Sequence, residues 1–279
     1  MSDPEFTVFG ASGFIGSALV ARLAREGRRV RAIGREAGDV AAIFRRPLGR
    51  AVFAIGVTAD FRSRPFDTVE AHVAEINRLL RDGEFESLTY LSSTRVYQRS
   101  GSTAEDTPLV VAPGSPNDLY NISKIAGESV CLGCGRANVR VARLSNVVGP
   151  GAGQQAFVDE LLGEGRTRGV VAPRGHPDSA KDYIALDDAL GLIEAIAERG
   201  RQTLYNVASG EQTSHRRVAE LIARETGWRA EFDESAARID FPPIDTNRIR
   251  TEFGFVPTAF EAYFPPRVRA FLEAAETRS

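Results

Sequence analysis

Three glycines spaced three residues apart, Gly10, Gly13 and Gly16, lie between an apolar run at residues 5–9 and an amphipathic stretch at residues 14–25. This order predicts a strand, a tight turn and a helix, because Gly10 permits the turn and Gly16 allows the helix to pack closely on the strand. At Gly13, the missing side chain lets backbone amides approach a ligand, and the positive end of the helix dipole favours an anion there. The feature therefore predicts a fold that binds the pyrophosphate of a dinucleotide.

The rest of the chain alternates β-rich and helical runs. We expect further strands at residues 29–33, 50–55, 87–91, 138–143 and 203–207, and helices at 68–80, 117–130, 188–198, 214–225 and 266–275. Strands that alternate with helices predict a doubly wound parallel α/β sheet with helices on both faces. We expect a dinucleotide-binding domain at residues 1–149 and a smaller, interleaved, mainly substrate-binding lobe at 150–279. Segments near 181–210 are expected to return to the main domain.

Charge and apolar patterning exclude several classes of partner. The 279 residues include 35 basic and 37 acidic side chains, so no basic surplus is available to neutralise a nucleic-acid backbone. No apolar run is long enough to span a membrane, and residues 1–6 lack the regions of a secretion signal. Two cysteines cannot form a disulfide framework, and Cys131 and Cys134 have no second pair with which to build a zinc site. We expect a cytoplasmic protein with no metal, nucleic-acid or membrane partner.

The end of the second expected strand bears on cofactor choice. A fold that selects NAD normally has an acidic residue there, whereas this chain has Gly34 followed by Arg35. A carboxylate would repel a 2′-phosphate, and a guanidinium can bind it through paired hydrogen bonds. We therefore predict NADP(H), with NAD(H) as the alternative because Glu36 is close enough in sequence to reach a ribose.

Lysine is scarce in this chain: Lys124 and Lys181 are the two lysines beside 33 arginines. Where lysine replaces arginine it offers a compact charge that can lose its proton, so both positions merit attention. Lys124 lies four residues after Tyr120, on the same face of the helix expected at 117–130. A nearby ammonium is expected to lower the pKa of the Tyr120 phenol, which could then exchange a proton with a substrate oxygen. Hydroxyls that could hold that oxygen, on Ser92, Ser93 and Thr94, follow the strand at 87–91.

Together these motifs resemble the extended short-chain dehydrogenase/reductase family, whose members include nucleotide-sugar epimerases, dehydratases and reductases. The resemblance covers nearly the whole chain and includes the runs at residues 10–16, 90–97, 105–108, 120–128, 143–151, 181–188, 204–210 and 245–254. It implies that Tyr120 is the acid/base and that Lys124 lowers its pKa and holds the nicotinamide ribose. It also implies that Ser93, four residues before Tyr97, is the catalytic hydroxyl.

Some positions depart from the family pattern. Dehydratases of this family carry an Asp-Glu pair directly after the catalytic hydroxyl, but this chain has Thr94 and Arg95, so we discount dehydration. His72 stands close to where many members have asparagine. The family also implies a homodimer, formed by packing of the helices expected at 68–80 and 117–130.

The predicted site residues divide into two groups. The predicted cofactor contacts are Gly10, Ser12, Gly13, Phe14, Ile15, Gly16, Arg35, Ile55, Gly56, Ser92, Tyr120, Lys124 and Ser145. The predicted substrate contacts are Arg62, Arg64, Thr94, Asn146 and Arg238, the last by resemblance to a diphosphate-binding arginine of the family.

Three functions remain open. The first is an NADP(H)-dependent ketoreductase acting on a nucleotide-activated (deoxy)sugar, and the second is an NAD-dependent nucleotide-sugar epimerase. The third is a non-catalytic dinucleotide-binding regulator, since a fold does not fix a function. Arg35 favours the reductase, because net reduction usually uses NADPH. Ser93, Tyr120 and Lys124 argue against the regulator.

Overall fold

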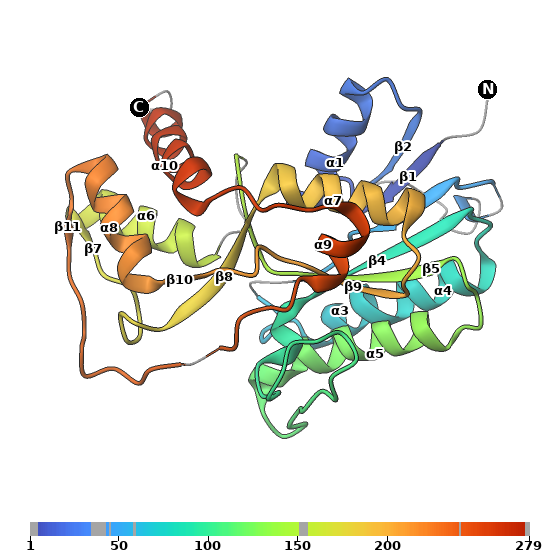
Figure 1. The fold of residues 1–279 in the computed structure, drawn as a ribbon, viewed down its shortest axis with the longest axis horizontal. Helices are drawn as coiled ribbons and strands as arrows, with labels where there is room; N and C mark the ends of the chain where they lie inside the picture. The colour runs from blue at the N-terminus through green and yellow to red at the C-terminus, as the bar shows by residue number, and fades with distance from the viewer. Residues whose placement is uncertain are drawn as a thin grey trace.

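A six-stranded parallel sheet forms the larger part of the molecule in the computed structural model, which describes residues 5–34, 43–44, 46–57, 60–150, 156–239 and 241–276 (Figure 1). The strand order is β2 (Val30–Ile33), β1 (Phe6–Phe9), β3 (Arg50–Phe53), β4 (Ser87–Ser93), β5 (Val139–Leu144) and β9 (Leu204–Val207). Every neighbouring pair of these strands is parallel. The predicted doubly wound α/β fold is confirmed.

Helices cover both faces of this sheet (Figure 1). On one face, α1 (Phe14–Arg25) and α7 (Leu186–Arg199) pack against Val8 and Val52. On the other face, α4 (Glu75–Asp82) and α5 (Leu119–Gly133) pack against Phe9 and Phe53. Successive side chains of a strand point to opposite faces, so apolar residues at adjacent positions supply both cores.

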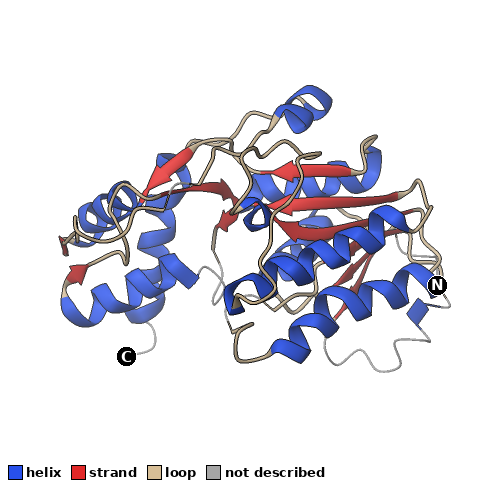
Figure 2. Cartoon of the chain, turned by 90° about the horizontal axis from the view of Figure 1, so that it is seen from below, coloured by secondary structure: helices blue, strands red, loops and turns tan. Residues whose placement is uncertain are grey.

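A smaller lobe has its own apolar core. It contains α6 (Ala156–Arg168), α8 (His215–Thr226) and α10 (Phe260–Glu276), together with the paired short strands β7 (Val170–Val171) and β11 (Arg229–Ala230). A three-stranded sheet of β10 (Gln212–Ser214), β8 (Ala180–Ala185) and β6 (Asn146–Val148) joins it to the main sheet, and α9 (Asn247–Phe253) packs beside β9. Figure 2 shows the main sheet on one side and the helices of the lobe on the other.

The helical stretch predicted at residues 68–80 is confirmed, but it is not α-helical throughout. It consists of α3 (Pro65–Val69), a π-helical turn at Glu70–Ala74 and α4. The backbone carbonyl of His72, in the π turn, accepts a hydrogen bond of 3.0 Å from the Tyr90 hydroxyl. Helix α5 approaches this turn so closely that a Cβ atom on Gly127 would lie 2.5 Å from the same carbonyl oxygen. The π turn therefore depends on tertiary contacts, and it places the His72 side chain beside α5.

Candidate active site

The glycine turn has the geometry of an anion site. Gly10 has φ +81°, and a Cβ atom there would lie 2.7 Å from the backbone of Ala54 at the end of β3. A Cβ on Gly16 would collide with the carbonyl of Gly10. Helix α1 begins after Gly13 with no side-chain cap and no acidic residue in its first turn. Its first N–H groups therefore suit a pyrophosphate, and this end of the sheet fits a dinucleotide.

The position that bears on cofactor choice lies next to this turn. Gly34 follows β2, and a Cβ atom there would make ordinary contacts with Ser12, at 3.8 Å from its Cβ. A side chain at position 34 would thus point toward the dinucleotide site without a steric clash. Arg35 lies outside the described residues.

The structure brings the three predicted catalytic residues together. Ser93 ends β4, whereas Tyr120 and Lys124 lie one turn apart on α5. The Ser93 hydroxyl lies near enough to the Tyr120 phenol to lower its pKa. The Lys124 ammonium donates to the Leu91 carbonyl at 2.9 Å, and a Cβ on Gly56 would lie 3.5 Å from its Nζ. All three side chains thus lie at the carboxyl edge of the sheet, where open α/β folds bind ligands.

The pKa of the Tyr120 phenol is shifted opposite to the predicted direction. Burial raises this pKa, and the Ser93 hydrogen bond and the Arg95 charge oppose the rise without reversing it. The expectation of a lowered pKa is therefore wrong for this structure, because spacing along a helix does not show how much water the fold removes from the phenol.

Lys124 is also shifted by burial. Loss of water lowers its pKa from 10.5 to about 8, although the Glu128 carboxylate partly opposes this. The side chain is 4% exposed. Near neutral pH the ammonium is therefore close to the range in which it loses its proton.

His72 is a positioning residue of the site. Its Nε2 accepts from the Val57 backbone N–H at 3.1 Å, so its Nδ1 carries the proton and donates to Ser123 Oγ at 2.8 Å. Ser123 donates in turn to the Tyr120 carbonyl at 2.9 Å. Burial and the Lys124 charge lower the His72 pKa to about 2, so the ring is neutral. The sequence indicated a role for His72 only weakly, because the residue stands close to a position where many members of the family have asparagine.

Ser92 takes part in a buried polar network. Its hydroxyl donates to Glu128, and the Arg143 guanidinium donates to the same carboxylate at 2.6 Å. Arg143 also donates to the Tyr97 hydroxyl at 2.6 Å, and Tyr97 donates to Asn206 Oδ1 at 2.9 Å. This network joins β4, α5, β5 and β9, so these motif residues hold the scaffold. The predicted contact of Ser92 with a cofactor stays a prediction.

Three further predicted residues follow strands of the two sheets: Thr94 comes directly after β4, Ser145 follows β5, and Asn146 begins β6. The Ser145 backbone N–H is occupied by the Val207 carbonyl at 3.0 Å, which leaves other Ser145 atoms for a ligand. Asn146 Nδ2 donates to the Asp182 carbonyl at 2.7 Å, and the Thr94 hydroxyl donates to the Leu144 carbonyl at 3.4 Å. Their roles toward cofactor and substrate stay predictions.

The three predicted substrate arginines have different surroundings. Arg64 pairs with Asp60 and Asp67, at 3.1 and 2.9 Å, on an exposed surface, so its charge is already matched. Arg62 donates instead to Asn117 Oδ1 at 2.7 Å. Arg238 is exposed in the segment that follows β11. Arg62 and Arg64, which were predicted together as substrate contacts, therefore differ in the structure: Arg64 is paired with carboxylates, and Arg62 is bonded to an uncharged amide.

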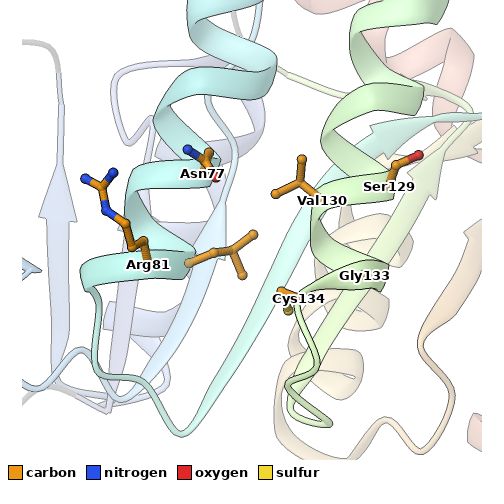
Figure 3. Close-up of a pocket in the computed structure, with 7 residues that line it drawn as sticks. Asn77, Arg81, Ser129, Val130, Gly133 and Cys134 are labelled. Carbon is orange, nitrogen blue, oxygen red and sulfur yellow. The ribbon is translucent and has the colours of Figure 1, made fainter.

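The groove in Figure 3 lies away from this site. It measures about 390 Å³, lies between α4 and α5, and is lined by Asn77, Leu80, Arg81, Ser129, Val130, Gly133 and Cys134. Val130 is ten residues from Tyr120, or about 15 Å along the helix at 1.5 Å per residue. Within the described ranges, no three His, Cys, Asp or Glu side chains are placed to hold a metal ion. None of the helices described is long and apolar enough to cross a membrane.

Comparisons with known proteins agree with this geometry. The sequence model of the "NAD dependent epimerase/dehydratase family" matches residues 6–208. A dTDP-glucose 4,6-dehydratase of Streptomyces griseus is 30% identical over 61% of this chain and 54% of its own length. A GDP-6-deoxy-D-mannose reductase of Pseudomonas aeruginosa is 31% identical over 54% of this chain and 52% of its own. The chain thus matches about half the length of these two relatives.

Two further similarities extend over nearly the whole chain. A dTDP-6-deoxy-L-talose 4-dehydrogenase (NAD(P)(+)) of Kitasatospora kifunensis is 26% identical, and the match covers 90% of each chain. The solved structure of RMD from Pseudomonas aeruginosa complexed with NADPH has a TM-score of 0.76 and 23% identity, over 99% of this chain and 100% of that one. The second similarity supports the fold, lobe included.

We expect the burial of Lys124 to be visible in a direct titration. Because the chain has two lysines, protein labelled with ¹³C at lysine Cε should give two signals, and Lys124→Met should remove one of them. The Lys124 signal should titrate with a midpoint near pH 8 instead of 10.5, since burial disfavours the charged form. A midpoint near 10.5 would show that the ammonium is exposed to water.

Proposed function

The chain belongs to the NAD dependent epimerase/dehydratase family, and on that premise we propose that it is an NADP(H)-dependent ketoreductase of a nucleotide-activated (deoxy)sugar. The observation that carries this proposal is the grouping of Ser93, at the end of β4, with Tyr120 and the buried Lys124 on α5. The raised pKa keeps the phenol protonated near neutral pH, which is the form that can donate a proton to a carbonyl oxygen.

The chain's own residues divide the work of such a reduction. When bound, the nicotinamide supplies a hydride to the carbonyl carbon. The Ser93 hydroxyl orients the carbonyl oxygen, and Tyr120 gives its phenolic proton to that oxygen, so ketone, hydride and proton become a secondary alcohol. The Lys124 ammonium holds the ribose hydroxyls, and the first amides of α1 hold the pyrophosphate. His72 fixes the backbone at Tyr120 through Ser123.

The site argues against the dehydration carried out by some relatives. Loss of water needs a general acid and base beside the catalytic hydroxyl, and here Thr94 and Arg95 occupy the two following positions. The Thr94 hydroxyl donates to a backbone carbonyl, and Arg95 is a cation. Neither can serve as a carboxylate acid or base. A nucleotide-sugar epimerase using a retained NAD remains the alternative, since it would use the same Ser93 and Tyr120.

The remaining proposals concern compartment and assembly. Cys131 and Cys134 are free thiols, which agrees with the reducing cytoplasm that we propose for this protein. For a homodimer, the support is exposed apolar surface on α3 and α5, just outside the ranges predicted for the two packing helices. Phe66 is 87% exposed on α3, and Leu132 is 46% exposed on α5.

Removing the Tyr120 hydroxyl should stop turnover and leave cofactor binding intact. Tyr120→Phe should lower kcat by about 10²–10⁴-fold and leave cofactor affinity nearly unchanged, because it removes only the phenolic hydroxyl and keeps the ring. Tyr183→Phe is the matched control, since the buried Tyr183 hydroxyl has no hydrogen-bond partner among the described residues. The measurement is NADPH oxidation with a keto-sugar nucleotide, together with cofactor titration. Unchanged turnover in Tyr120→Phe would refute the catalytic role.

The cofactor preference should follow position 34. We expect wild type to bind NADP(H) about 10–100-fold tighter than NAD(H), the preference that one charge-assisted pair supplies. Gly34→Asp with Arg35→Ala should reverse it, because the change adds a repulsive carboxylate and removes an attractive cation. Gly101→Asp, in a loop where a Cβ meets nothing within 4 Å, controls for added charge. Equal affinity of wild type for both cofactors would instead favour the epimerase.

We expect the exposed apolar surface of α3 and α5 to be buried in a homodimer in solution. Light scattering at micromolar concentration should give twice the chain mass, and Phe66→Glu should reduce it to that of one chain, since a buried charge opposes association. A wild type that stays monomeric would contradict the proposed dimer.

A further inference from the structure

Two guanidinium groups are fixed beside the catalytic tyrosine. Arg95 and Arg62 both lie against the buried ring of Phe61, with their Cζ atoms 5.2 and 4.5 Å from its centroid. Arg95 also lies 5.3 Å from the centroid of the Tyr120 ring. Asn117 anchors both arginines: its side-chain oxygen accepts from Arg62 at 2.7 Å, and its backbone carbonyl accepts from Arg95 at 3.2 Å.

Among the residues that the structure describes, no acidic side chain forms an ion pair with Arg95 or Arg62. Asp118 attracts Arg95 but pairs with Arg99 at 3.4 Å. Burial and the charge of Arg62 both lower the pKa of Arg95. Two guanidiniums held together on one aromatic ring therefore leave an excess of positive charge beside Tyr120.

A third cation lies within electrostatic range of Arg95. Lys181 lies on β8, with its ammonium 4.3 Å from the centroid of the Phe157 ring. Burial and the charge of Arg95 lower its pKa, whereas Glu160 opposes this. The neighbouring His215 is neutral, because burial and the Lys181 charge lower its pKa to about 4. Arg95 is therefore close enough to Lys181 for their charges to repel, so the positive charge beside Tyr120 extends toward β8.

We propose that Arg95, assisted by Arg62, binds a carboxylate on the sugar itself, so that the substrate is a nucleotide-activated acidic sugar of the uronic-acid type. This inference rests on the proposed function, because it takes the sugar to react at Tyr120. Arg95 contacts the Tyr120 ring, so an anion that it binds lies beside the reacting carbonyl. The diphosphate belongs to the other end of the sugar, near the predicted contacts Asn146 and Arg238. A planar guanidinium matches a carboxylate through two parallel hydrogen bonds.

A carboxylate bound by Arg95 would also affect the catalytic phenol. The Arg95 charge opposes the rise in the Tyr120 pKa, so it favours the phenolate. A carboxylate paired with Arg95 would offset that charge and favour the neutral phenol, which is the form that carries a proton for the carbonyl oxygen.

The test compares matched acidic and neutral ligands on the protein saturated with NADP⁺. The probes are UDP-glucuronic acid against UDP-glucose, and glucuronic acid 1-phosphate against glucose 1-phosphate, titrated by calorimetry. Wild type should bind the acidic member of a pair about tenfold or more tightly, as expected for one charge-assisted pair. Arg95→Gln should abolish that difference by weakening the acidic ligand alone, and Arg95→Lys should restore part of it.

Controls separate this inference from the proposed function. Arg78→Gln, on α4, removes an arginine that is already paired with Glu70 and Glu75, and it should leave both affinities unchanged. Unaltered NADP⁺ affinity will show that Arg95→Gln is folded. Equal binding of acidic and neutral ligands by wild type, or an equal loss for both in Arg95→Gln, would overturn the inference and leave the nucleotide-sugar proposal standing. Binding of no probe at all would overturn both.

Discussion

The hydrogen bond from the Lys124 ammonium to the Leu91 carbonyl sets the register between α5 and β4, and the site depends on that register. From Leu91 to Ser93 the strand advances two residues, about 6.6 Å, and from Lys124 back to Tyr120 the helix advances four residues, about 6 Å. The two elements therefore bring Ser93 and Tyr120 to the same level at the edge of the sheet. A shift of one residue in either element would separate the phenol from the hydroxyl that orients the substrate oxygen.

Helix α5 approaches β4 closely enough for the Lys124–Leu91 hydrogen bond, and the helix that precedes β4 is distorted where α5 packs against it. The Tyr90 hydroxyl donates a hydrogen bond to the His72 carbonyl directly beside Gly127. Any side chain at position 127 would clash with both of these groups. The preceding helix accommodates the carbonyl by widening into a π turn. Such turns occur often at functional sites, and this one directs the neutral His72 ring edge-on toward Tyr120, with 5.4 Å between ring centroids. The contacts among Gly127, Tyr90 and His72 that pack α5 against the scaffold thus also position the His72 ring beside the catalytic tyrosine.

Periodicity and turn chemistry predicted the local elements well. The helix expected at 14–25 has those same ends in the structure, because a glycine turn precedes it and its apolar positions recur on one face. The π turn could not be predicted, since it depends on Tyr90 and Gly127, which are distant in sequence. The direction of the Tyr120 pKa was missed for a related reason: burial is a property of the whole fold. Arg64, predicted as a substrate contact, is different, because Asp60 and Asp67 lie four residues before and three after it, and this spacing in the sequence was a signal of ion pairing that the prediction did not use.

The surroundings of Tyr120 determine the protonation state from which the chemistry starts. Because burial raises its pKa, the phenol holds its proton near neutral pH, which is the state that a reduction needs, whereas an oxidation would first have to remove that proton. Arg95, which lies at the ring of Tyr120, opposes this shift, and the buried Lys124 is itself shifted toward losing its charge. An anionic substrate group that pairs with Arg95 would offset a charge that favours the phenolate. Recognition of the substrate and the protonation state of the catalytic phenol are then coupled through Arg95.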